Sequence, residues 1–136
     1  MRGTIHHIDL TVSDLMVSAA FYETVLGFLG YRRTSTRPDY VDWNLAGGDG
    51  LLCSIGLKAA RSDRQHDRYS VGLHHLAWHA VDRADVDSLH ELLVGRKATI
   101  LDPPTEYPAY GAGYYAVFFA DPDGLKLEFV HYPGEA

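Results

Sequence analysis

The sequence has a single cysteine, Cys53, so it cannot form an intramolecular disulfide bond. This cysteine usage fits a reducing compartment, and we expect a cytoplasmic location. No apolar run approaches the roughly 18 residues that a membrane-spanning helix needs. Residues 1–12 are too short and too polar for a signal peptide. These absences argue against a membrane partner and against export.

Basic residues are also scarce. The 136 residues include 12 Lys and Arg against 18 Asp and Glu, which gives a formal net charge of −6. Because no basic stripe is available to meet phosphates, we do not expect a nucleic-acid partner. What the chain does have is a hydrophobic content of 46%, which is enough for a real core. The length predicts one domain or two small fused modules.

The chain reads as two copies of one pattern. A histidine that opens a strand, an aspartate before a helix and a glycine at the helix end all recur 68 residues later. The pairs are His7 and His75, Asp14 and Asp82, and Gly27 and Gly95. The Asp-Gly dipeptides at residues 49–50 and 123–124 match with an offset of 74, which aligns Glu128 with Ser54. Four matches in register indicate an internal repeat.

Each copy predicts a strand, a helix and then about three further strands. Residues 4–12 alternate as in a half-buried strand, and residues 14–26 carry apolar side chains at helical spacing. Asp14 or Ser13 is the expected N-cap of that helix, and Gly27 is its expected end. Further strands are expected near residues 40–45, 51–57, 98–101, 114–119 and 125–130, and the two Asp-Gly dipeptides predict hairpin turns.

Two segments lack an apolar pattern. The charged residues 58–72 form the expected linker between a first module, residues 1–57, and a second module, residues 73–136. Residues 102–113 are rich in Pro, Gly and Tyr and predict a loop. Loops of this length in compact domains are often lids, and a plain surface loop is the alternative.

A lone glutamate, Glu128, stands in the strand-like run that closes the chain. Its neighbours include Leu125, Leu127 and Phe129. A carboxylate among such side chains is costly to bury unless it is paired or bound to a metal. Lys126, on the same predicted strand face, is one candidate partner, and a metal ion is the other.

Strand alternation selects two histidines to join Glu128. His7 lies opposite the apolar face of the first strand, and His75 is its counterpart in the second copy. If each helix covers the apolar face of its sheet, both histidines and Glu128 point to the other face. Two imidazoles and one carboxylate form the facial triad that holds a divalent metal with open positions. The alternative assigns the histidines to strand edges or interfaces.

Asp9 and His79 flank the proposed metal face. They are candidate catalytic residues, as proton acceptors or as partners of the metal ligands. A hydrogen bond within the sheet is the alternative for both. His6 and His74 fall on the helix-packing side, where a structural role is expected.

Three segments resemble the vicinal oxygen chelate superfamily, which includes glyoxalase I, extradiol dioxygenases, fosfomycin-resistance transferases and bleomycin-resistance proteins. HHIDLTVSDLMVSAAFYETVLGF resembles the opening of the first module, and HHLAWHAVDRADVDSLHELL and FFADPDGLKLEFVH resemble the opening and closing of the second. The resemblance implies an α+β fold whose two βαβββ modules form a partly open mixed β-barrel around a metal, and it implies a homodimer. It places the metal ligands at His7, His75 and Glu128.

Departures from the family patterns separate the activities. Glyoxalase I has a further carboxylate at the position of Ser54, so glyoxalase I activity is not expected. Extradiol dioxygenases have a tyrosine at the position of Phe118. Fosfomycin transferases have a threonine at the position of Asp9 and a basic residue beyond the closing strand. The reaction type therefore stays open among dioxygenase, lyase and transferase.

The resemblance implies a metal-dependent enzyme that chelates two adjacent oxygens of a small oxygen-rich substrate. Two imidazole ligands favour Mn²⁺, Fe²⁺, Ni²⁺ or Zn²⁺ over Mg²⁺ or Ca²⁺. A non-enzymatic binding protein of the bleomycin-resistance kind, which sequesters a planar or cationic drug, is the alternative. The residues expected to line the substrate pocket are aromatic: Trp43, Tyr107, Tyr110, Tyr114 and Phe118.

Overall fold

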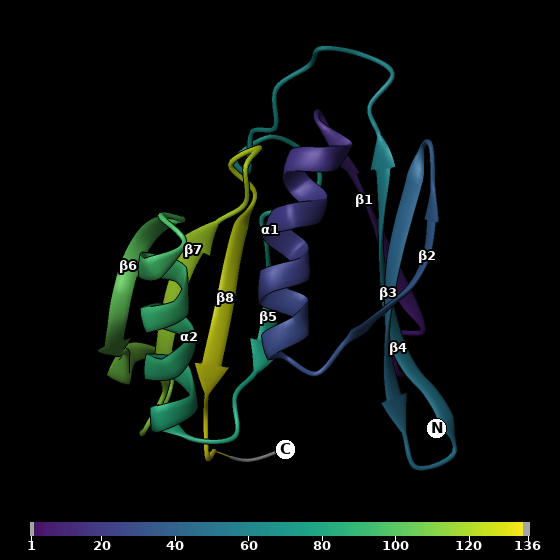
Figure 1. Ribbon diagram of the computed structural model, residues 1–136. Helices are drawn as coiled ribbons and strands as arrows, with labels where there is room; N and C mark the ends of the chain where they lie inside the picture. Colours follow the sequence, from purple (N-terminus) through teal and green to yellow (C-terminus); the bar gives the residue numbers. More distant parts are fainter. Residues whose placement is uncertain (1, 135–136) are drawn as a thin grey trace. The chain divides into compact units, whose positions relative to one another are not determined.

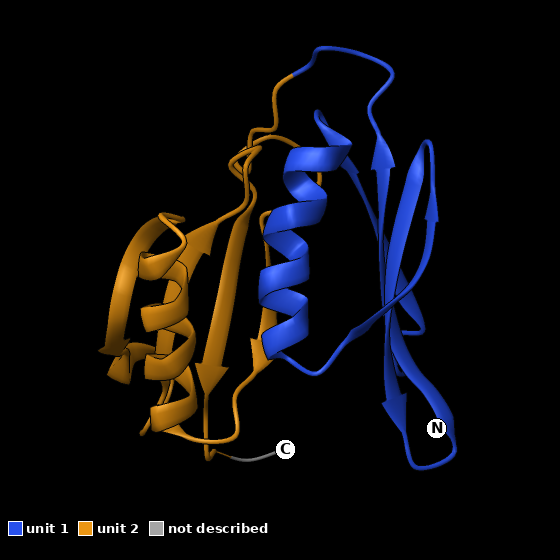
Figure 2. Ribbon diagram, viewed as in Figure 1, with its two compact units in different colours: residues 1–64 blue, residues 65–136 orange. Residues whose placement is uncertain are grey.

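The structure is a computed structural model in which residues 2–134 are described. The chain divides into two compact units, residues 1–64 and residues 65–136 (Figure 2). The first unit contains β1 (His7–Val12), α1 (Leu15–Phe28), β2 (Arg32–Arg37), β3 (Tyr40–Gly47) and β4 (Gly50–Ala59). The second contains β5 (His75–His79), α2 (Arg83–Gly95), β6 (Thr99–Glu106), the 3₁₀ turn η1 (Pro108–Tyr110), β7 (Tyr115–Ala120) and β8 (Lys126–His131).

The two units share one topology. The strand order is β1-β4-β3-β2 in the first sheet and β5-β8-β7-β6 in the second (Figure 1). In each sheet the first strand pairs in parallel with the last, and the other neighbours are antiparallel. A parallel pair needs a long crossover, which the helix and the two intervening strands supply. The expected α+β fold of two βαβββ modules is confirmed, and each sheet is open at both edges.

One face of each sheet is apolar and packs on the helix of its own unit. In the first unit, register sets Ile8, Ile55 and Trp43 side by side on this face. The helix contributes buried side chains that include Tyr22 and Leu26. Figure 1 shows α2 lying along the second sheet, against β6, β7 and β8. Neither helix in residues 2–134 has both the length and the apolar character needed to cross a membrane.

Both helices begin at the aspartates that the sequence predicted. The Asp14 side chain accepts a hydrogen bond from the Val17 amide at 3.1 Å, so Asp14 rather than Ser13 is the cap. The Asp82 side chain accepts from the Asp85 amide at 2.8 Å, and Asp85 in turn accepts from the Val81 amide at 2.9 Å. The bonds to Val17 and Asp85 each satisfy an amide that the first helical turn leaves without a partner.

The helices end later than predicted. Gly27 and Gly95 lie within the helices, so their assignment as stop residues is wrong. In α1 the left-handed residue is Gly30, with φ of +93°. In α2 that position is held by Lys97, with φ of +58°. Both ends have the same pair of closing hydrogen bonds, from the amides of the left-handed residue and of its successor.

Three further boundaries differ from the sequence prediction. Strand β2 was missed because RRTSTR has no apolar alternation, as is common in an edge strand. Strand β4 continues to Ala59, so two residues of the predicted linker belong to the sheet. Residues 102–106, predicted as part of a loop, continue strand β6. Both Asp-Gly dipeptides lie at the expected turns between β3 and β4 and between β7 and β8.

Lys97 yields the first prediction. A left-handed conformation costs a residue that has a Cβ roughly 1–2 kcal/mol. Glycine avoids this cost, but it loses more conformational entropy on folding, which offsets about 0.5–1 kcal/mol of the gain. Lys97→Gly should therefore raise the free energy of unfolding by about 0.5–1 kcal/mol in urea titrations. Arg96→Gly is the matched control because Arg96 has a φ of −91°. It should lower that free energy, and an equal loss in both variants would contradict the assignment.

Candidate functional site

The parallel pairing of β5 with β8 brings two predicted metal ligands to one face of the second sheet. Register sets His75 opposite Lys126 and Ala77 opposite Glu128. Because side chains two residues apart on a strand share a face, His75 lies on the same face as Glu128, one row away. The Nε2 atom of His75 is 3.8 Å from Oε2 of Glu128.

Glu128 is buried, with 2% of its surface exposed. The Tyr114 hydroxyl donates a 2.6 Å hydrogen bond to Oε1, which leaves Oε2 facing His75. Lys126, the alternative partner predicted from sequence, instead holds its ammonium 4.4 Å from the centre of the Phe118 ring. The carboxylate is therefore oriented by Tyr114, with its second oxygen on the side of His75.

The histidine pairs have the same geometry in both units. Nδ1 of His75 lies 2.7 Å from Nδ1 of His74, and Nδ1 of His7 lies 2.9 Å from Nδ1 of His6. One ring of each pair must donate and the other accept. His6 and His74 thus engage the inner nitrogens of the predicted ligands, which leaves both Nε2 atoms available.

This donor set fits a divalent transition metal. A carboxylate oxygen and an imidazole nitrogen are ordinary ligands of such ions, and a hydrogen bond that orients a ligating carboxylate is a common supporting feature. Within residues 2–134 no three His, Cys, Asp or Glu side chains are gathered closely enough to hold an ion. Of the three predicted metal ligands, His75 and Glu128 belong to the second unit and His7 belongs to the first.

Aromatic side chains surround Glu128 in the second unit. Phe118 is the register partner of Glu128 and packs with Ala116 and Val130 in a small cluster that Tyr107 and Tyr114 adjoin. The Tyr107 ring lies 5.4 Å from Phe118 in an edge contact. Tyr110 stacks on Tyr107, also at 5.4 Å. Four of the predicted pocket residues are thus neighbours on one face.

Burial, followed by the hydrogen bond to Glu128, raises the pKa of Tyr114 well above its ordinary value. Burial likewise raises the pKa of Tyr107. Both phenols therefore remain protonated at physiological pH. Tyr114 acts as a fixed hydrogen-bond donor to the carboxylate.

Trp43, the fifth predicted pocket residue, has a different position. Its side chain is fully buried, and its indole Nε1 donates to Glu23 of α1. Strand β3 places Tyr40, Asp42 and Asn44 on the other face of the sheet. Trp43 is a core residue, and the alternation of residues 40–45 contains the signal that would have assigned it there.

The open face of the first unit is polar. His7 lies opposite Ser54, and Asp9 lies opposite Gly56. In the second unit, Ala77 occupies the position that Asp9 has in the first, and Glu128 lies opposite Ala77. The residue of the first unit that is equivalent to Glu128 is therefore Gly56 and not Ser54. Aligning the two copies on their Asp-Gly dipeptides gave the wrong equivalence. Strand β4 begins at Gly50, within the first dipeptide, whereas β8 begins only at Lys126, two residues after the second.

Gly56 has no room for a carboxylate side chain. A Cβ at this position would collide with Oδ1 of Asp9 and lie 2.8 Å from the Tyr40 ring. Asp9 therefore fills the space that a glutamate on β4 would occupy. Its other oxygen lies 3.4 Å from the ammonium of Lys58.

The two predicted catalytic residues differ in their surroundings. Asp9 is two residues from His7 on the same face, about 7 Å along the strand. His79 is exposed at the end of β5, opposite Val130 and about 13 Å along the strand from His75. Along its strand, Asp9 is thus nearer to a predicted metal ligand than His79 is. Sequence reasoning did not identify two residues near Asp9. The Lys58 ammonium pairs with its carboxylate, and the Tyr40 ring lies beside Gly56, the register partner of Asp9.

Comparisons with known proteins agree with this architecture. Residues 4–129 match the model of the Glyoxalase/Bleomycin resistance protein/Dioxygenase superfamily. The chain belongs to this superfamily. It is 35% identical over 126 residues to the uncharacterized protein YqjT of Bacillus subtilis, covering 93% of this chain and 97% of that protein.

Two more proteins are similar to this chain over most of its length. The metallothiol transferase FosB of Lysinibacillus sphaericus is 33% identical over 127 residues, covering 93% of this chain and 80% of FosB. The crystal structure of a glyoxalase candidate from Bacillus halodurans superposes with a TM-score of 0.82 at 29% identity. That superposition covers 96% of this chain and 97% of the other. The chain is thus similar to these proteins over most of its length, in sequence and in fold.

The Tyr114 hydrogen bond yields a stability prediction. Tyr114→Phe leaves a buried carboxylate with one donor fewer, so the free energy of unfolding of metal-free protein should fall by about 1–3 kcal/mol. Tyr115→Phe is the matched control, because the Tyr115 hydroxyl donates to Asp87 at the same distance, 2.6 Å, but at an exposed site. That variant should lose about 0.5 kcal/mol or less in the same denaturant titration. Equal losses would show that Glu128 does not depend on Tyr114.

Proposed function

We propose that this protein is a metal-dependent enzyme of the vicinal oxygen chelate type that acts on a small, oxygen-rich substrate. The observation that carries the proposal is the buried Glu128 carboxylate, held by Tyr114 with its second oxygen toward His75. A buried carboxylate in this setting is costly unless a cation or a positive partner neutralises it.

The proposed ligands are Nε2 of His7, Nε2 of His75 and the Glu128 carboxylate. Two neutral imidazoles and one carboxylate favour Mn²⁺, Fe²⁺, Ni²⁺ or Zn²⁺, whereas Mg²⁺ prefers oxygen ligands. When bound, such an ion supplies positive charge to oxygens of the substrate at its open positions. Tyr114 is a positioning residue, since it restrains the carboxylate without itself being a ligand.

The polar and aromatic groups around the ligands have separable roles. Tyr107 and Phe118 give the second unit an apolar wall that excludes water from one side of a substrate. Asp9 is the proposed proton acceptor, because it is the carboxylate nearest to His7 along β1. The Lys58 ammonium lies 3.4 Å from the Asp9 carboxylate.

Among the reaction types, group transfer has the most support. One relative, at 33% identity, is the metallothiol transferase FosB. Glyoxalase I activity is disfavoured because Gly56 stands where that enzyme has a carboxylate. Phe118, in place of a tyrosine, disfavours extradiol dioxygenase activity. We therefore propose a thiol transferase, in which His7, His75 and Glu128 would hold the ion, with Asp9 as the main departure from fosfomycin transferases.

A binding protein of the bleomycin-resistance kind is the second candidate. The stack of Tyr107 on Tyr110 favours it, because stacked rings accommodate a planar ligand. Binding of a planar ligand with equal affinity before and after metal removal would favour this candidate over the enzyme.

We also propose that the protein is cytoplasmic and forms a homodimer, as the family resemblance implies. Analytical ultracentrifugation at micromolar concentration should give a mass of twice 15.1 kDa. A single monomer mass across that range would contradict the dimer.

Metal content tests the proposed ligands. Protein purified without chelator should contain about one divalent ion per chain, and Glu128→Gln should contain far less, because the amide keeps the shape of the side chain but loses its charge. His66→Ala is the matched control, since His66 is exposed and lies outside the site. Elemental analysis and circular dichroism on each variant separate metal loss from unfolding. Equal metal content in wild type and Glu128→Gln would end the proposal.

Tyr114→Phe tests the positioning role. Loss of a hydrogen bond to a ligating carboxylate typically weakens metal affinity by about 10–100-fold. Competition with a fluorescent chelator should show a loss in that range, while Tyr115→Phe keeps the wild-type affinity. An unchanged affinity in Tyr114→Phe would assign Tyr114 a structural role only.

A further inference from the structure

The open face of the first sheet is arranged in rows that cross its strands. Register sets Thr11, Lys58, Tyr40 and Arg37 side by side, one residue from each of the four strands. Side chains of directly paired residues lie on the same face, about 5 Å apart from strand to strand. A hydroxyl, an ammonium, a phenol and a guanidinium thus form one continuous row of hydrogen-bond donors.

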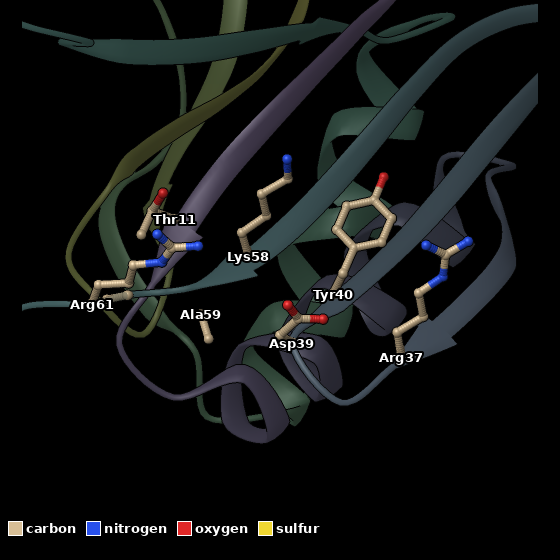
Figure 3. Close-up of a pocket in the computed structure, with 8 residues that line it drawn as sticks. Thr11, Arg37, Asp39, Tyr40, Lys58, Ala59 and Arg61 are labelled. Carbon is tan, nitrogen blue, oxygen red and sulfur yellow. The ribbon is translucent and has the colours of Figure 1, made fainter.

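A pocket of about 770 Å³ opens above this row. Figure 3 shows Lys58 and Tyr40 on neighbouring strands, with Thr11 and Arg61 on one flank and Arg37 on the other. The remaining lining residues are Asp39, Ala59 and Ala60, so every lining residue belongs to the first unit.

Two of the three cations in this pocket lack a carboxylate partner. Lys58 pairs with Asp9 at 3.4 Å, whereas in residues 2–134 no carboxylate lies within 4.0 Å of the guanidinium of Arg37 or Arg61. Asp39 is the only acidic residue among those that line the pocket. The pocket therefore has a positive excess, although the whole chain has a formal charge of −6.

We propose that this pocket binds the oxyanion group of a small ligand, as a phosphate, phosphonate or carboxylate. The Arg37 and Arg61 side chains lie on opposite flanks of the pocket and supply the charge (Figure 3), and planar guanidinium groups recognise such oxygens with paired hydrogen bonds. Thr11, beside Arg61, supplies a neutral donor.

Tyr40 lies between the cations of this pocket. Burial, followed by the charges of Asp42 and Asp9, raises its pKa above the ordinary value, and its hydroxyl is hydrogen-bonded to Asp42. Its ring lies 5.7 Å from the Lys58 ammonium. An incoming anion therefore meets Lys58, Arg37 and Arg61 beside a neutral phenol.

This site is distinct from the proposed metal ligands. Thr11 is four residues from His7 on β1, which is about 13 Å along the strand. The proposed ion at His7 and an anion at Thr11 would occupy separate positions on this strand. Anion binding should therefore persist in metal-stripped protein, whatever the fate of the metal proposal.

The test is a titration of metal-stripped protein with inorganic phosphate and with phenyl phosphate, followed by phosphorus NMR at low ionic strength. Saturable binding of either ligand is expected. If phenyl phosphate binds more tightly, the ligand of the pocket is an organic molecule that carries the oxyanion. If inorganic phosphate binds more tightly, the ligand is a free anion. No saturable binding of either ligand overturns the proposal.

Three variants locate the binding. Arg37→Gln combined with Arg61→Gln should weaken binding by at least about tenfold, because each removes charge-assisted hydrogen bonds. Asp39→Asn should tighten it by removing the one acidic side chain that lines the pocket. Arg96→Gln, in the second unit, makes the same charge change as one arginine variant and should leave the affinity unchanged. Equal affinity in wild type and the double variant, or an equal loss in Arg96→Gln, overturns the site.

Discussion

The register between the first and last strand of each unit determines what each open face can do. In the second unit it sets Glu128 one row from His75, close enough for the carboxylate and the imidazole to face each other. A slip of one residue would turn Glu128 into the helix-packing core, where a carboxylate has no partner. The parallel pair and the candidate metal site therefore depend on the same hydrogen-bond ladder.

One topology supports two chemically different faces. On its open face the second unit surrounds the buried Glu128 carboxylate with aromatic rings. The first unit replaces that carboxylate with Gly56 and lays out Asp9 and a row of donors across all four strands. Register-equivalent positions thus give one sheet a buried carboxylate and the other a row of polar donors without changing the fold.

Alternation and turn chemistry were sufficient to predict most of the fold and part of the site. They placed His75 and Glu128 on one face because a strand has a period of two, and the same rule would have assigned Trp43 to the core. The Tyr114 contact was beyond sequence reasoning, since it joins side chains 14 residues apart and depends on the loop before β7. The equivalence of Gly56 and Glu128 could not be read from the sequence either, because the hairpin turns before β4 and β8 differ in length and change the offset between the two copies.

Direct observation of a bound metal is the most stringent test of the proposed site. Crystals grown with Mn²⁺ or Zn²⁺ would be measured by anomalous diffraction at the absorption edge of the ion. The predicted result is one ion per site, bound to the Nε2 atoms of His7 and His75 and to the Glu128 carboxylate, with Tyr114 still hydrogen-bonded to Glu128. An ion bound elsewhere, or no anomalous peak beside Glu128 at saturating metal, would contradict the account.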